Sequence, residues 1–154
     1  MIPLKPLLKV SVATAALLFV VAWLTPVHEY GTTLAQGGVP GWEAFRVALT
    51  PLWSFQDAMV ETWYGSIHTV VSALTNFLFV AALAHMLWRP GTYGRAVCWL
   101  LVAATVINAT WFLLDGDRGA LRLGYYLWVS SFAVLATAAW FVPTSDPETS
   151  PQPQ

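Results

Sequence analysis

The sequence predicts an all-α membrane protein whose four transmembrane helices form an antiparallel bundle. Hydrophobic residues make up 57% of the 154 residues and charged residues only 10%, whereas soluble domains average about 45–50% and about 25%. Four long runs also contain at most one charged residue, Lys9 in the first, and each approaches the roughly 20 residues that a helix needs to cross the hydrocarbon core. We therefore expect one transmembrane domain over residues 1–142, with spans at about 7–24, 67–88, 96–114 and 123–142.

The charge balance and the cysteine content exclude several functions. The chain has seven Lys and Arg residues and eight Asp and Glu residues, so there is no basic patch of the kind that nucleic acid requires. Cys98 is the only cysteine, which excludes an intramolecular disulfide and paired-thiol chemistry. Catalytic motifs, phosphate-binding glycine loops and charged pairs deep in a helix are missing as well. We expect no catalysis and no cofactor.

The first apolar run follows Lys5 and Lys9, so it could be a signal peptide or a first span. It ends at Trp23, Leu24 and Pro26 without a nearby small-x-small cleavage site. We interpret residues 7–24 as an uncleaved span.

The stretch 25–66 is too long for a simple turn and is rich in tryptophan. After the glycines at 37, 38 and 41, Trp42 and Phe45 begin a helical apolar pattern that Pro51 should interrupt. Such a helix could lie in the headgroup layer or cover the bundle as a lid. We expect a helical, Trp-rich outer loop and leave these two alternatives open.

The remaining connections set the pairing of the helices. Arg89 to Arg95 contains proline and glycine in a tight turn, and Asp115 to Gly119 forms a second short return, so consecutive spans should be antiparallel. The tail 143–154, with four prolines, lacks the apolar surface to fold and is expected to be disordered in the cytoplasm.

The positions of the basic residues predict the orientation. Lys5, Lys9, Arg89 and Arg95 fall on one side, against Arg46, Arg118 and Arg122 on the other. Because the first helix usually dominates, both termini should be cytoplasmic in a bacterial inner membrane. Tryptophans near the helix ends are expected to anchor the protein at the two interfaces: Trp23, Trp42, Trp53, Trp63, Trp88, Trp99, Trp111 and Trp140.

The second span carries a polar stripe around which we expect the bundle to be organised. His68, Ser72, Thr75 and Asn76 fall within roughly a 100° arc of the helix, and His85 lies apart from them. At about 1.5 Å of rise per residue, Asn76 lies about 13 Å below the outer end, near the depths of Asn108 and of Ser130 and Ser131. These residues could meet in one polar layer, either to fix helix packing or to line a ligand or ion path.

A haem or metal site at the outer face is a further alternative. His28 follows the first span and His68 begins the second, and Glu29, Asp115 and Asp117 are expected at the same outer face. Imidazoles from two helices can hold haem iron, and two histidines with a carboxylate suit several metals. An interfacial hydrogen bond is the simpler role for either histidine.

The segments Pro40 to Phe45 and Leu123 to Phe132, together with Asn76, resemble a diffuse group of uncharacterised four-span bacterial inner-membrane proteins. The resemblance covers most of residues 1–142 and implies location and architecture, with no assigned activity. We expect a structural or accessory subunit that packs in the bilayer with itself or with a larger membrane complex. The alternatives are a small transporter or ligand-binding bundle, and a haem or metal protein.

Overall fold

The computed structural model describes residues 4–29, 38–54, 63–88, 94–114 and 120–141. The described chain is mostly helical, and four of its helical segments are long and apolar enough to cross a membrane, which confirms the predicted all-α class. Two short strands were not expected. The elements in order are α1 (Leu4–Leu24), β1 (Pro26–His28), β2 (Val39–Pro40), α2 (Gly41–Ala48), the 3-10 helix η1 (Thr50–Leu52), α3 (Trp63–Trp88), α4 (Arg95–Ala109), α5 (Trp111–Leu114) and α6 (Leu123–Trp140).

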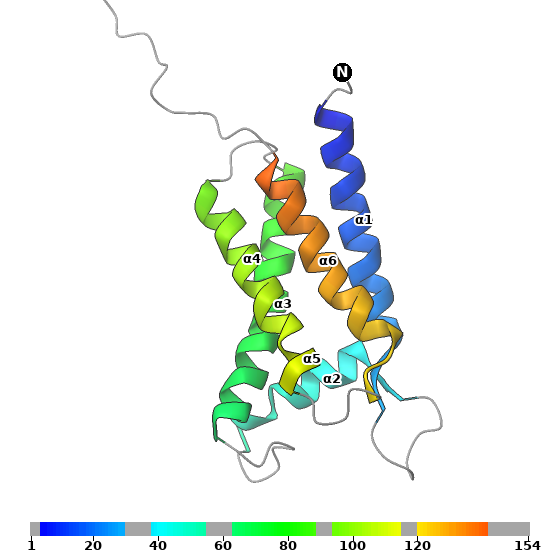
Figure 1. Cartoon of the computed structure of the whole chain (residues 1–154), viewed down its shortest axis with the longest axis vertical. Coiled ribbons are helices and arrows are strands. Elements are labelled where there is room, and N and C mark those ends of the chain that lie inside the picture. The colour runs from blue at the N-terminus through cyan, green and yellow to red at the C-terminus, as the bar shows by residue number, and fades with distance from the viewer. Residues whose placement is uncertain (1–3, 30–37, 55–62, 89–93, 115–119, 142–154) are drawn as a thin grey trace, which may run out of the picture.

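The long helices run side by side, with α6 between α1 and α4 and with α3 behind them (Figure 1). The start of α1 and the end of α6 lie at the same end of the bundle, which we call the termini end. The opposite end, here the loop end, holds β1, β2, α2 and α5 (Figure 1). The most extensive helix contacts join α6 to α1 and to α4, so α6, rather than α3, is the central packing element.

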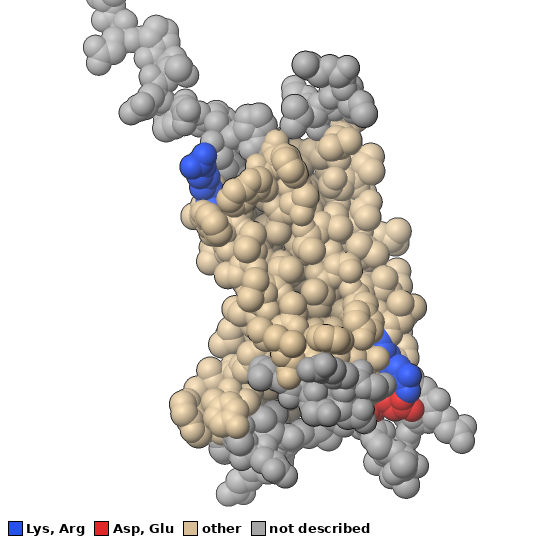
Figure 2. All heavy atoms as spheres, viewed as in Figure 1, with Lys and Arg blue, Asp and Glu red and all other residues tan. Residues whose placement is uncertain are grey.

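Charged side chains are confined to the two ends of the described bundle on the face shown in Figure 2, and the surface between them is uncharged. An α-helix forms its backbone hydrogen bonds within itself, which hydrocarbon requires, and its uncharged side chains can then face lipid. Many of the exposed side chains on the long helices are large and apolar, including Leu17, Phe77 and Val106. This surface is therefore compatible with contact with lipid along its length.

The observed helix boundaries differ from the expected spans chiefly at three places, the first being the start of α1 at Leu4 rather than near residue 7. Helix α3 begins at Trp63, four residues before the expected start at Ile67. The third span is divided, because α4 ends at Ala109 and α5 begins at Trp111. Residues 30–37 and 55–62 of the expected outer loop, and the expected tail 143–154, lie outside the described residues.

Toward the termini end, the core consists of apolar side chains from all four long helices. Phe79 and Phe132 are fully buried, and their ring centroids lie 4.9 Å apart. Phe19 stacks on Phe79 at 4.4 Å, so α1, α3 and α6 meet at three aromatic rings. Alanines and other buried residues fill the remaining space: Val12, Ala15, Ala82, Met86, Cys98, Leu101, Leu135, Ala136 and Ala139. We call these nine residues the apolar half.

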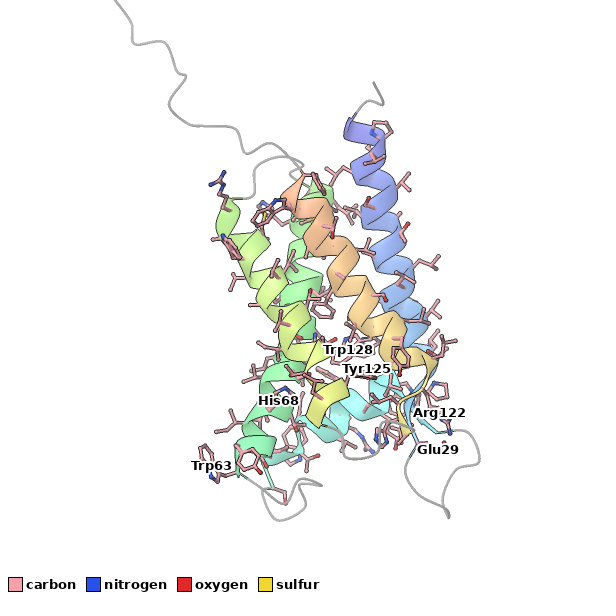
Figure 3. All side chains as sticks on the ribbon, viewed as in Figure 1. Glu29, Trp63, His68, Arg122, Tyr125 and Trp128 are labelled. Atoms are coloured by element: carbon pink, nitrogen blue, oxygen red, sulfur yellow. The ribbon has the colours of Figure 1, made fainter. Side chains whose placement is uncertain are left out.

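At the loop end, β1 joins α1 to the start of α6. It pairs with β2 on one side and with the segment before α6 on the other, where Arg122 N donates to Val27 O and Glu29 N donates to Ala120 O. A Cβ atom at Gly124 would lie 2.6 Å from Pro26 O and 2.8 Å from Thr25 O. Glycine therefore permits α6 to start directly against the end of α1, and an ion pair between Glu29 and Arg122 lies beside this contact (Figure 3).

Candidate functional site

A closed chain of hydrogen bonds joins α3, α4 and α5 inside the bundle. Trp111 Nε1 donates to Ser72 Oγ at 3.0 Å, and Ser72 Oγ donates to Asn108 Oδ1 at 2.9 Å. Asn108 Nδ2 donates to Thr75 Oγ1 at 3.0 Å, and that hydroxyl donates to Ser72 O at 2.6 Å. Asn108 is fully buried, and Ser72 and Thr75 are nearly so. The bonds from Ser72 to Asn108 and Thr75 therefore return to Ser72, and Trp111 donates to this closed group from α5.

A second hydrogen-bonded group joins α3 to α6. Trp128 Nε1 donates to Asn76 Oδ1 at 2.9 Å, and Asn76 Nδ2 donates to Ala73 O at 2.9 Å. The Trp128 ring also contacts Phe132 edge-on at 6.0 Å. The indole therefore bonds to a polar residue of α3 while its apolar body packs against the core.

A tyrosine from α6 contacts the backbone where α4 gives way to α5. Tyr125 Oη donates to Asn108 O at 3.1 Å, with Ala109 O at 3.3 Å, and accepts a hydrogen bond from Phe112 N at 3.2 Å. Side chains that insert into a helix ladder in this way cause bends. Together these hydrogen-bonded residues form what we call the polar network: Ser72, Thr75, Asn76, Asn108, Trp111, Tyr125 and Trp128.

His68 contacts the same break from the α3 side. Its Nε2 lies 2.8 Å from Thr110 Oγ1 and 3.3 Å from Ile107 O. Because the Thr110 hydroxyl donates to Ile107 O at 2.6 Å, the proton between His68 and Thr110 is assigned to Nε2. The ring meets Trp111 edge-on at 4.6 Å, and its buried Nδ1 has no hydrogen-bond partner among the described residues.

The structure divides the residues of the expected polar layer among separate hydrogen-bonded groups. Asn76 and Asn108 bond to different partners. Ser131 is fully buried but donates to Trp128 O of its own helix, and Ser130 is exposed. Figure 3 shows His68, Tyr125 and Trp128 in the lower half of the bundle, near α5.

Sequence reasoning missed Tyr125 and Trp128 as members of the polar network and assigned Trp111 to an interface. The available signal was their spacing, because positions 125, 128 and 132 fall on one face of a helix. Both aromatic types carry a polar group that seeks a partner when buried. A polar aromatic facing a buried amide on a neighbouring span is therefore the pattern that could have identified them.

The expected anchoring tryptophans divide into two groups. Trp23 packs against Phe19 and Phe45 inside the fold, and Trp111 is bound in the polar network. The other six are exposed at the ends of the described bundle, with exposed fractions from 49% to 84%: Trp42, Trp53, Trp63, Trp88, Trp99 and Trp140.

The two histidines of the expected haem or metal site contact different elements. His28 belongs to β1 and forms a bridge with Leu121, whereas His68 contacts Thr110 and Trp111. Within the described ranges, no three His, Cys, Asp or Glu side chains come together as metal ligands. Asp115 and Asp117 lie outside those ranges.

The hydrogen-bonding groups of Asn108 are directed into the protein, and this determines what the site can do chemically. Its amide oxygen accepts from Ser72 and its amide nitrogen donates to Thr75. Ser66 Oγ is buried without a hydrogen-bond partner in the described part of the chain, but it projects about 160° around α3 from His68. No protein-family model, curated protein or solved structure matches the chain.

Proposed function

We propose that the chain is an integral protein of the bacterial inner membrane that acts by helix packing, as a structural or accessory subunit without catalysis. The closed chain of hydrogen bonds from Trp111 through Ser72, Asn108 and Thr75 carries this proposal. Between membrane helices such bonds stabilise by about 0.6–2 kcal/mol each, which is enough to fix helix rotation. A bundle held in this way presents a defined outer surface to a second copy or to a larger membrane complex.

The exposed tryptophans support a transmembrane placement with both interfaces occupied. Trp63 and Trp88 stand at the two ends of α3, with 69% and 84% of their surfaces exposed. A helix of 26 residues is about 39 Å long at 1.5 Å per residue, which is close to the roughly 40–45 Å between the outer faces of the headgroup layers. Trp99 and Trp140, paired edge-on at 5.3 Å, extend the aromatic belt at the termini end.

We place the outer loop in the headgroup layer while it also covers the bundle. Phe45 points inward, where its ring lies 5.2 Å from Trp23 and 5.8 Å from Phe77. Trp42 on the same helix remains half exposed, and Trp53 is more exposed. Helix α2 thus has one face for the bundle and one for the interface.

Native mass spectrometry of the protein released from membranes tests the packing role. We expect a homo-oligomer or a complex with another membrane subunit, carrying only phospholipid in addition. A monomer that carries a stoichiometric haem, metal ion or small solute would contradict the proposal.

Cysteine accessibility separates packing from transport. In a Cys98→Ala background, Ser131→Cys should not react with a charged methanethiosulfonate reagent, because a packed bundle admits no water at the polar network. Trp53→Cys, at an exposed position, is the matched control and should react. Labelling of both variants would favour the transporter alternative.

Orientation is tested separately with reporter fusions. Lys9 and Arg95 lie toward the termini end and Arg46 and Arg122 toward the loop end, and basic residues flanking the first helix favour the cytoplasm. Alkaline phosphatase fused after Gln154 should be inactive, whereas a fluorescent protein at the same position should fluoresce. The reverse pattern would overturn the proposed orientation.

A further inference from the structure

The third span is interrupted where a hydroxyl occupies the place of a backbone hydrogen bond. In an unbroken α-helix, Phe112 N would donate directly to Asn108 O. Here Phe112 N donates to Tyr125 Oη at 3.2 Å, and Tyr125 Oη donates to Asn108 O at 3.1 Å. One hydroxyl from α6 thus stands between the two groups that would otherwise bond to each other.

The backbone on either side of the interruption stays close to helical. Thr110 has φ −64° and ψ −19°, and Thr110 N still donates to Val106 O at 3.0 Å. Closing the ladder would therefore require only small dihedral changes. The same turn is bonded from the opposite side, because His68 Nε2 lies 3.3 Å from Ile107 O.

We propose that residues 107–110 form a hinge with two hydrogen-bonded arrangements, and that the Tyr125 hydroxyl selects between them. In the bent arrangement the hydroxyl is inserted, and Trp111 bonds to Ser72. In the straight arrangement Phe112 N bonds to Asn108 O, the hydroxyl is withdrawn, and α5 continues the axis of α4. Tyr125 is 5% exposed, so withdrawal would take its buried hydroxyl away from Asn108 O and Phe112 N. The free-energy cost of losing these hydrogen bonds favours the bent arrangement.

Movement at the hinge shifts α5 relative to α3. A change in bend of about 20°, acting over the roughly 6 Å length of a four-residue helix, moves its far end by about 2 Å. Trp111 is the first residue of α5, and its indole bonds to Ser72. The hinge therefore couples the α4–α5 break to the hydrogen bonds of α3, a property that a rigid packing role does not require.

Solution NMR of the full chain in detergent micelles tests the hinge through the Phe112 amide and the Trp111 indole. Tyr125→Phe removes the inserted hydroxyl, and we expect both resonances to shift toward the straight arrangement. Tyr126→Phe is the matched control, since Tyr126 is the exposed neighbour on the same helix, and it should leave both resonances in place. Coincident spectra for Tyr125→Phe and the wild type would overturn the proposal.

A measurement on the wild type keeps the hinge testable if the variant does not fold. Chemical-exchange saturation transfer should detect a minor state of Phe112 populated between about 0.1% and 10%. Its shift should equal that of the folded Tyr125→Phe variant or, without that variant, lie at the position of an amide bonded to a carbonyl. A wild type without exchange at Phe112 and Trp111 would show a fixed bend and refute the hinge.

Discussion

The apolar half joins all four spans and the polar network joins three of them, and the two regions do so by different means. In the apolar half, Leu101 and Leu135 are fully buried among alanines, and close packing joins the helices, with one thiol hydrogen bond from Cys98 Sγ to Ala139 O at 3.3 Å. In the polar network, Asn108 and Trp128 each bond across to α3. Lipid tails are as apolar as leucine, so burial does not drive association, and close packing or hydrogen bonds must supply it. Close packing in the apolar half therefore sets the contact area between the helices, and hydrogen bonds in the polar network set the rotation of each helix about its axis.

The largest effect is expected where the two regions meet, at Phe132. Phe132→Ala should lower the free energy of unfolding by about 3–5 kcal/mol, because it leaves a cavity beside Phe79 and removes the edge contact with Trp128. Unfolding by titration with a denaturing detergent in mixed micelles measures the change. Phe141→Ala, at an exposed position, should change stability by less than about 0.5 kcal/mol. Equal losses in the two variants would remove Phe132 from its central role.

Close backbone approach at the loop end gives the next effect. Gly124→Ala should destabilise by about 1–3 kcal/mol, because the added Cβ would overlap the carbonyl oxygens of Thr25 and Pro26. Gly94→Ala is the control, since nothing lies within 4 Å of a Cβ at that position. Thermal unfolding of both variants in the same detergent compares them, and a Gly124→Ala variant as stable as Gly94→Ala would show that α6 can move away from α1 without cost.

The two amides give smaller effects that divide the polar network. Asn108→Leu should cost about 1–3 kcal/mol, since the Ser72 hydroxyl loses its acceptor and the Thr75 hydroxyl loses its donor, and Asn76→Leu about 0.6–2 kcal/mol. Because the two asparagines share no partner, the double variant should equal the sum of the single variants within about 0.5 kcal/mol. A larger departure from additivity in the detergent titration would show that the two groups act as one.

Much of the fold could be predicted from the sequence, because the length and uncharged character of each run depend on local composition. The rotation of each helix about its axis could not. The spacing of Tyr125 and Trp128 places them on one face of α6, but which neighbouring helix that face meets, at Asn108 and Asn76, depends on the packing of the whole bundle. Strand β1 was missed because three residues containing Pro26 carry no alternating pattern, and its pairing depends on contacts with residues 120–122 that are distant in the chain. Contacts between residues distant in the chain therefore determine the helix rotations and the pairing of β1, which the local sequence pattern does not specify.

The smallest expected effect concerns the ion pair between Glu29 and Arg122, whose side chains are 49% and 47% exposed. Glu29→Gln should lower stability by no more than about 1 kcal/mol, because solvent screens exposed pairs, and the difference from wild type should shrink further in high salt. The contact between β1 and the start of α6 is then held chiefly by the backbone bonds of Val27 and Glu29. A loss comparable to that of Gly124→Ala, unchanged by salt, would instead make the ion pair the element that fixes α6 to the loop end.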